Sequence, residues 1–199
     1  MNESVHRTKL YACSTNLGKL REFVLAAGPD VDLEPLPDLK SVEPPEESGV
    51  TFEENAVIKA LYYSRFTSEL VFADDSGLAV DALGGEPGVY SARYSGPSAS
   101  DVDNNRLLLE RMQGKSGRRA RFVCVIALAR EGKLLGTFTG VVEGEILHHP
   151  RGANGFGYDP LFFCPALGAT LAEVEGAAKF AISHRGNAVR AMLASLRAG

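Results

Sequence analysis

The chain has 199 residues, a length typical of one domain, with or without lobes, and short for two independently folded units. Hydrophobic residues make up 45% and charged residues 23%, which is ordinary for a globular protein and excludes a disordered or low-complexity chain. With 21 Lys and Arg against 25 Asp and Glu, the net charge of −4 provides no general attraction to nucleic acid or to an anionic membrane. A phosphate-bearing ligand would therefore need a local binding site.

Two further features bear on where the protein works. The longest uninterrupted apolar run, Phe122–Ala129, is far shorter than the roughly 20 residues that cross a bilayer. Met1–Leu10 is polar and lacks the apolar segment of a secretory signal, so we expect a cytoplasmic protein. The three cysteines cannot all pair and match no zinc pattern, so we expect them to be small buried hydrophobes.

Strand and helix periods alternate along the first half of the chain. The expected elements are a strand over Lys9–Ser14, a helix from Leu20 to Ala27, a strand over Val31–Leu36, a helix from the capping box of Thr51 and Glu54 to about Phe66, and a short buried strand over Leu70–Ala73. The last of these strands runs directly into Asp74-Asp75-Ser76-Gly77, so we expect the two carboxylates at a strand end.

A long hairpin dominates the second half. The expected elements are a glycine-rich loop over Gly84–Gly96, a capped helix from near Asp101, hairpin arms over Arg121–Arg130 and Lys133–Leu147, a second glycine-rich loop over Gly152–Tyr158, a short strand over Pro160–Phe163 and a final helix capped by Ser183. Early alternation followed by a hairpin predicts an α/β fold: a single domain over residues 1–199, with a mixed central sheet and helices on its faces.

The turn between the first strand and the first helix is a candidate phosphate site. Its residues are Ser14, Thr15, Asn16, Leu17, Gly18 and Lys19. Unpaired backbone N–H groups at a helix N-terminus, hydroxyl and amide donors and a lysine would meet there. An ordinary asparagine cap with a solvated lysine explains the same residues. The chain contains neither a P-loop nor a Gly-x-Gly-x-x-Gly pattern.

Two acidic pairs, Glu46-Glu47 and Asp74-Asp75, are candidate ligands for Mg²⁺. Magnesium binds one or two protein carboxylates and fills its other positions with water and substrate phosphate. A metal ion between these carboxylates would turn their repulsion of phosphate into attraction. Because neighbouring strand residues face opposite sides, we expect one aspartate to face the metal and the other to bind backbone amides of the following loop. A solvated acidic loop is the alternative for the glutamates.

Two later clusters could contact a ligand. Phe156-Gly157-Tyr158-Asp159 combines aromatic rings with a permissive glycine, which suits stacking on a base, although the rings could equally fill the core. Ser183-His184-Arg185 begins the last helix, where its donors could hold an anion or a carbonyl or simply lie on the surface. Lys59, four residues after Asn55 on one helix face, is a candidate for electrostatic support near the metal or a solvated lysine.

Taken in order, these motifs resemble one family. The motifs are Ser14-Thr15-Asn16-x-x-Lys19, Glu46-x-x-Gly49-x-Thr51-Phe52-x-x-Asn55-Ala56, Ala73-Asp74-Asp75-Ser76-Gly77-Leu78, Gly155-Phe156-Gly157-Tyr158-Asp159-Pro160 and Ser183-His184-Arg185-Gly186. They resemble the inosine triphosphate pyrophosphatase family, and within it the bacterial non-canonical purine nucleoside triphosphate pyrophosphatases. The resemblance covers nearly the whole chain.

The resemblance implies a fold, a reaction and a set of site residues. It implies two lobes around a substrate cleft, a homodimer, and Mg²⁺-dependent hydrolysis of XTP, ITP and dITP to the monophosphate and pyrophosphate, which removes deaminated purines from the nucleotide pool. Carried onto this chain, the implied roles are phosphate binding by Ser14 to Lys19, metal binding by Glu46 and Asp75, general-base action by Asp75, substrate positioning by Ser76, and contacts to base and sugar by Phe156, Gly157, Tyr158, Asp159, Lys179, His184 and Arg185.

Hydrogen-bond chemistry is consistent with that substrate class. Hypoxanthine and xanthine carry a carbonyl at C6, and Arg185 and Lys179 are pure donors, so adenine would leave donors facing donors. Three alternatives stay open from the sequence: a related pyrophosphatase of the septum-formation inhibitor type, a metal-dependent phosphatase that releases orthophosphate, and a nucleotide-binding module without catalysis.

Overall fold

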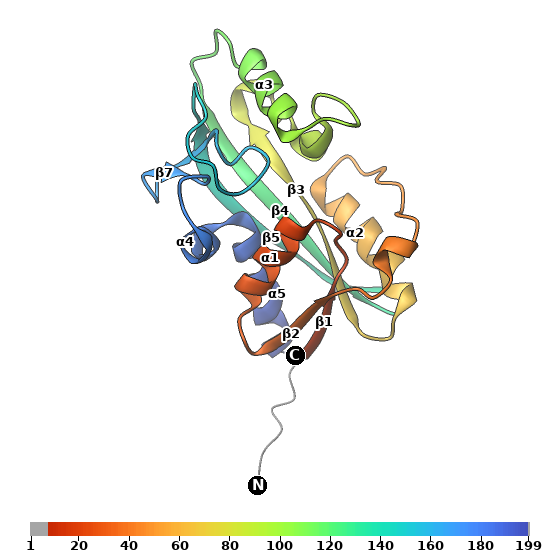
Figure 1. The fold of residues 1–199 in the computed structure, drawn as a ribbon. Coiled ribbons are helices and arrows are strands. Elements are labelled where there is room, and N and C mark those ends of the chain that lie inside the picture. The colour runs from red at the N-terminus through yellow and green to blue at the C-terminus, as the bar shows by residue number, and fades with distance from the viewer. Residues whose placement is uncertain (1–7, 199) are drawn as a thin grey trace.

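A seven-stranded mixed sheet runs through the molecule in the order β2-β1-β3-β4-β5-β6-β7 (Figure 1). The computed structural model describes residues 8–198, so the first seven residues of the expected polar N-terminus lie outside the described residues. β1 pairs in parallel with β2 and β3, and the remaining neighbours pair antiparallel. The strands are β1 (Thr8–Ala12), β2 (Val31–Pro35), β3 (Leu70–Val80), β4 (Arg119–Arg130), β5 (Lys133–Ile146), β6 (Phe162–Cys164) and β7 (Ala169–Thr170). The predicted mixed α/β architecture is confirmed.

Helices cover both faces of this sheet. They are α1 (Leu17–Ala27), α2 (Phe52–Tyr63), α3 (Asp101–Arg111), α4 (Gly176–Ile182) and α5 (His184–Ala198), with 3₁₀ helices η1 (Leu39–Ser41), η2 (Ser64–Phe66), η3 (Asp81–Leu83) and η4 (Gly88–Arg93). The sequence patterns missed α4, which is short and has no side-chain hydrogen bond at its N-cap, Glu175. Within residues 8–198, no helix has the length and apolar character needed to cross a membrane.

Three apolar clusters hold these layers together. On one face of the sheet α1 and α5 pack on β1, β3 and β4, where Phe23 and Phe72 meet edge-to-face with ring centroids 5.1 Å apart. On the other face, α2 lays Ala56 and Ala60 against β3 and β4. A third cluster joins α3 to the far halves of β3, β4 and β5 (Figure 1). The long strands are therefore shared by two parts of the molecule, one near α1, α2 and α5 and one near α3.

Two local signals in the sequence are present in the structure as predicted. Thr51 Oγ1 accepts a hydrogen bond from the Glu54 amide while Glu54 Oε2 accepts one from the Thr51 amide, which completes the capping box of α2. The hairpin of β4 and β5 turns at Glu131 and Gly132, whose φ angles of 48° and 76° are both positive. Positive angles at both turn positions match the twist of the strands that leave the turn.

The position of the aspartate pair differs from the prediction. β3 does not end before Asp74 but continues to Val80, paired throughout with β4, so that Asp74 lies opposite Ile126 and Asp75 opposite Val125. Both carboxylates are therefore in the middle of a central strand. The apolar pattern ends at Ala73 because polar side chains replace it at the site, while the backbone ladder continues.

A glycine in β5 allows α5 to approach the sheet closely. A Cβ atom at Gly140 would overlap backbone atoms of His184 and Ala188, both in α5. At Gly136 in the same strand, a Cβ atom would come within 3.1 Å only of the Phe138 ring, which is a side chain that can move. Gly140 thus sets the position of the first turn of α5.

We predict that Gly140→Ala lowers the free energy of unfolding by about 2 kcal/mol, since α5 must shift away from β5. Gly136→Ala is the matched control and should cost less than about 1 kcal/mol because only a ring edge is displaced. Urea unfolding followed by circular dichroism measures both values. Equal stability of the two variants would contradict the close approach at Gly140.

Candidate functional site

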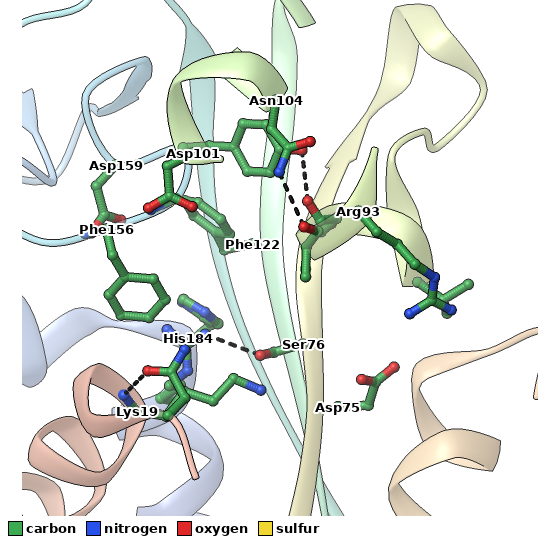
Figure 2. A pocket seen from close by; sticks show the side chains of 18 of the residues that line it. Lys19, Asp75, Ser76, Arg93, Asp101, Asn104, Phe122, Phe156, Asp159 and His184 are labelled. Carbon is green, nitrogen blue, oxygen red and sulfur yellow. Dashed lines mark hydrogen bonds between the residues drawn. The ribbon is translucent and has the colours of Figure 1, made fainter. Parts of the chain in front are cut away.

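One cavity lies where the two parts of the molecule meet on β3 (Figure 2). Its lining comes from α1, α2, β3, β4, the η4 segment, α3, the loop after β5 and the start of α5. Ten of the residues predicted for the site line it: Asn16, Lys19, Asp75, Ser76, Phe156, Gly157, Tyr158, Asp159, His184 and Arg185. Segments far apart in the sequence thus contribute to a single site.

Asp74 points from β3 toward α1. Its Oδ2 is 2.8 Å from Lys19 Nζ and accepts a hydrogen bond from Ser76 Oγ at 3.0 Å. Burial alone would raise the pKa of this carboxyl, but Lys19, Lys59 and Arg185 outweigh burial and lower the pKa to about 2. The prediction that the second aspartate binds backbone amides is wrong, because Asp74 binds side chains. It is buried, and it holds Lys19 in place.

Asp75 points to the opposite face of the sheet, toward α2. Its Oδ1 is 3.1 Å from Lys59 Nζ, and its Oδ2 accepts a hydrogen bond from Asn55 Nδ2 at 3.4 Å. Lys59 Nζ also lies 3.1 Å from Glu47 Oε2, so one ammonium bridges two carboxylates. Burial raises the pKa of the Asp75 carboxyl above its ordinary value, although Lys59 opposes the shift. The expected division of roles between the aspartates is therefore present, with Asp75 facing the cavity.

A buried ion-pair network joins the first helix to the last two. Glu22 of α1, which the sequence reasoning missed, lies 3.0 Å from Lys179 Nζ through Oε1 and 3.0 Å from Arg185 Nη1 through Oε2. Lys179 Nζ is also 2.6 Å from Asp159 Oδ2, and Arg185 Nη2 donates to Ser76 Oγ at 3.0 Å. Burial opposes the charge of Lys179, but the two carboxylates outweigh it and raise the pKa of this lysine. Lys179 thus lies behind the cavity, and its Nζ contacts carboxylates of the protein.

Phe156 lies over the cationic end of this network. The centroid of its ring is 4.9 Å from the Arg185 guanidinium and 5.6 Å from Lys179 Nζ. Gly18 permits this placement, since a Cβ atom there would come within 3.0 Å of the ring. The backbone amide of Phe156 donates to Asp159 Oδ2 at 3.0 Å, which fixes the loop from below. Figure 2 shows the ring at the side of the cavity opposite to Asp75.

The remaining residues of the same motif serve the structure of the loop. Tyr158 is buried at the cavity wall, and its hydroxyl donates to the Ser91 carbonyl at 2.8 Å. The Gly157 amide donates to Asp101 Oδ2 at 2.7 Å, and its carbonyl accepts from Asn105 Nδ2 at 2.8 Å. The two open interpretations of this motif therefore divide between its rings: Phe156 borders the cavity and Tyr158 is part of the core.

His184 is held as a neutral imidazole. Its ring stacks on Phe122 with centroids 4.8 Å apart and an interplanar angle of 11°. Burial and the nearby charges of Arg185 and Lys179 lower the pKa of His184 well below its ordinary value. Within residues 8–198 neither ring nitrogen has a hydrogen-bond partner, and Arg185 Nε has none either. Polar atoms left in this state at a cavity wall are partners for a bound ligand.

With this geometry established, comparison with known proteins identifies the family. The model of the Ham1 family matches residues 10–195. The chain belongs to the Ham1 family. It is 49% identical over 197 residues to a protein of Acidobacterium capsulatum named dITP/XTP pyrophosphatase, with 94% of this chain and 97% of that protein covered. A protein of the same name from Geobacter sulfurreducens is 50% identical over 188 residues, with 92% and 93% covered.

Solved structures agree with this assignment. The Staphylococcus aureus Ham1 protein superposes with a TM-score of 0.86 at 41% identity and covers 96% of this chain and 99% of its own. A structure from Mycobacterium abscessus titled nucleoside-triphosphatase and dITP/XTP pyrophosphatase gives a TM-score of 0.73 at 41% identity, with 94% and 99% covered. The fold expected from the resemblance is therefore confirmed.

In this Ham1-family chain, several predicted residues lie away from the cavity. Ser14, Thr15 and Leu17 line a separate groove beside β2 and η1. Glu46 is exposed and does not line the cavity, whereas its neighbour Glu47 does. The phosphate turn thus presents Asn16 and Lys19 to the cavity rather than all six of its residues.

The structure also adds residues that the sequence patterns did not single out. They are Glu22, Ser91, Arg93, Asp101 and Asn104, of which all but Glu22 line the cavity. A signal existed for Glu22, since a carboxylate three residues after Lys19 borders the apolar stripe of α1 and must be paired if it is buried. No comparable local signal marks the residues of the η4 segment.

The carboxylates facing the cavity form a donor set that suits Mg²⁺. Within the described part of the chain, no three His, Cys, Asp or Glu side chains form a group that could hold a metal ion. Magnesium needs only one or two carboxylates when phosphate and water complete its shell. Lys59 already places a cation between Glu47 and Asp75, so a positive charge is accommodated at this position. Asp75 with one carboxylate of the acidic loop would therefore hold the ion.

We predict that Asp74→Asn lowers the free energy of unfolding by about 2 kcal/mol at pH 7. The pKa of Asp74 is about 2 in the folded state against an ordinary value of 3.8, so its ionisation stabilises the fold above about pH 4. This contribution is lost as the pH falls toward 2, where the variant and the original chain should converge. Urea titrations at pH 7, 4 and 3 measure the difference.

The control for that series is Asp81→Asn, because Asp81 is exposed and its ion pair with Arg121 at 3.3 Å lies at the surface. It should change stability by less than about 0.5 kcal/mol at any of these pH values. A pH-independent deficit in Asp74→Asn would show that lost packing, not charge, explains it.

Proposed function

We propose that this chain is a nucleoside triphosphate pyrophosphatase that hydrolyses XTP, ITP and dITP to the monophosphate and pyrophosphate. One observation carries the proposal: a single cavity has the Asp75 and Lys59 pair at one side and the Phe156 ring over Arg185 at the other. That arrangement suits a ligand with a polyphosphate end and a flat aromatic end. The names of the curated relatives support the substrate class.

The aromatic side of the cavity supports binding of a purine that carries carbonyl groups. Phe156 offers a face for stacking, which is worth roughly 1–3 kcal/mol per base. The Arg185 guanidinium has only donors, and its Nε is without a partner among residues 8–198. A base with a C6 carbonyl supplies the acceptor, whereas the amino group of adenine would face a donor and leave both groups unpaired. Neutral His184 can provide one donor and one acceptor.

Lys179 enters this scheme indirectly. Its three contacts are supplied by the protein, and Glu22 and Asp159 tie it to the two residues that border the base site, Arg185 and Phe156. We therefore assign it a positioning role for the base site in place of the direct contact expected from the resemblance.

The polar side supports hydrolysis at the α-phosphorus. Asp75 is the general base of this proposal: its carboxylate orients a water molecule and takes its proton as the water oxygen attacks. Lys59 keeps Asp75 ionised and in place through the 3.1 Å contact. Lys19 and Asn16 face the same cavity and bind phosphate oxygens, while Ser76 positions the substrate. A bound Mg²⁺ would neutralise phosphate charge and polarise the phosphoryl oxygens.

Cytoplasmic location and a homodimer belong to the same proposal. Cys13, Cys124 and Cys164 are buried and free, which suits a reducing compartment. The homodimer rests on the resemblance alone, and sedimentation equilibrium would test it directly.

The decisive experiment separates products. With Mg²⁺ present, we predict that the chain converts ITP and XTP to monophosphate and pyrophosphate at least about a hundredfold faster than ATP, since a lost hydrogen bond at a buried site costs several powers of ten. Asp75→Asn should lower turnover about a thousandfold, which is within the range for removal of a general base, while ITP still binds. Ion chromatography and isothermal titration calorimetry measure these quantities, and Asp81→Asn should remain fully active.

Each alternative has its own outcome in that assay. Orthophosphate as the first product would indicate a phosphatase, and preference for other nucleotides would indicate the septum-formation inhibitor type. Binding of ITP without Mg²⁺-dependent turnover would indicate a regulatory module. Full activity of Asp75→Asn would remove Asp75 from its role.

The metal ligands make a second prediction for the acidic loop. Glu47 is already paired with Lys59, whereas Glu46 has no ion-pair partner within residues 8–198 and its carboxylate is available to a cation. Glu46→Gln should therefore raise the Mg²⁺ concentration for half-maximal activity by about tenfold, equivalent to about 1.4 kcal/mol. Glu43→Gln, at an exposed position of the same loop, is the control. If only Glu47→Gln shifts the Mg²⁺ dependence, Glu47 is the ligand instead.

A further inference from the structure

Three of the four cations that line the cavity are already paired with carboxylates of the protein. Lys19 is paired with Asp74, Lys59 with Glu47 and Asp75, and Arg185 with Glu22. Arg93 is the fourth, and within residues 8–198 it has neither an ion pair nor a hydrogen bond through its side chain. Its one specific contact is with the Tyr90 ring, whose centroid is 5.3 Å from the guanidinium carbon.

The backbone that carries Arg93 is held firmly. The Ala92 carbonyl accepts a hydrogen bond from Asn104 Nδ2 at 3.1 Å, and the Ser95 amide donates to Oδ1 of the same asparagine at 2.9 Å. Ser91 Oγ accepts from the Leu78 amide at 2.9 Å, which ties η4 to β3. Arg93 is therefore an exposed, uncommitted guanidinium on a fixed base at the cavity wall.

Its position relates it to the phosphate side of the cavity. In the view of Figure 2, the Arg93 guanidinium lies on the side of Asp75, away from Phe156. It belongs to η4, whereas Lys19 and Lys59 come from α1 and α2 across the cavity. A polyphosphate that reaches from the base site past Asp75 would pass between these elements.

Charge balance gives a reason for a further cation there. The carboxylates that line the cavity, Glu47, Asp75, Asp101 and Asp159, equal in number the cations Lys19, Lys59, Arg93 and Arg185. A nucleoside triphosphate brings several negative charges into a lining that is already neutral, so its distal phosphates need a donor that is not committed elsewhere. Guanidinium suits this task because its planar fork can bind phosphate oxygens in pairs.

We infer that Arg93 binds the distal phosphates of the substrate and stabilises pyrophosphate as it leaves. The inference rests on the proposed function. In the reaction, water forms the new bond to the α-phosphorus, and the bond from that phosphorus to the bridging oxygen of the β-phosphate breaks. The electron pair of the broken bond departs with pyrophosphate, and the proton of water goes to Asp75. Arg93 stays protonated throughout and donates hydrogen bonds to the departing oxygens.

The test compares two products as ligands of the intact protein by isothermal titration calorimetry. For Arg93→Gln we expect the Kd of pyrophosphate to rise about tenfold or more, as for a lost charge-assisted hydrogen bond, and the Kd of IMP to change less than twofold. The value of kcat/KM for ITP should fall in parallel with pyrophosphate affinity. Arg93→Lys should recover part of the loss because it keeps the charge without the fork.

Arg65→Gln is the matched control, since Arg65 is an exposed arginine in the 3₁₀ helix η2 and does not line the cavity. It should leave all three quantities unchanged. A pyrophosphate Kd altered less than twofold in Arg93→Gln would overturn the inference, as would an equal loss for IMP and pyrophosphate, which indicates a structural role. Failure of the unaltered chain to release pyrophosphate from ITP would instead overturn the proposed function, because the binding comparison needs no turnover.

Discussion

Consecutive carboxylates in the middle of a central strand require a cation on each face of the sheet. Asp74 and Asp75 point in opposite directions because of the strand pleat, so one must be balanced from the α1 side and the other from the α2 side. Lys19 and Lys59 meet this requirement at 2.8 and 3.1 Å. An unpaired buried charge would cost several kcal/mol, so the two helices and the strand have to form together. The cavity between them follows from that constraint.

The base side of the cavity depends on a second set of paired charges. Glu22 binds both Lys179 and Arg185, and Arg185 continues through Ser76 to Asp74, so that one network extends from α4 and α5 to β3 and α1. Removing one member of such a network leaves its partners buried and unpaired. We therefore regard the network as the support that fixes Arg185 beneath the Phe156 ring. Specificity for the base and placement of the phosphates are then coupled through Ser76.

Much of the local structure could be predicted because its causes are local. The capping box of Thr51 and Glu54 begins α2, and positive φ angles at Glu131 and Gly132 turn the hairpin, as the sequence indicated. α4 was missed since a short helix without a capping side chain leaves no periodic signal. The end of β3 was misplaced because the pattern of side chains reports burial, whereas the strand is maintained by backbone hydrogen bonds to β4.

The sequence by itself determined the α/β order of elements, the alternate facing of the two aspartates and, through the resemblance of its motifs, the family. These depend on neighbours along the chain, or on short patterns that survive as text. Only the tertiary structure decided that Glu22 lies between Lys179 and Arg185, that Glu47 shares Lys59 with Asp75, and that Arg93 stands unpaired at the cavity wall. Charges separated by up to 163 positions have to meet for such pairs to form, and no local pattern encodes which of them will do so.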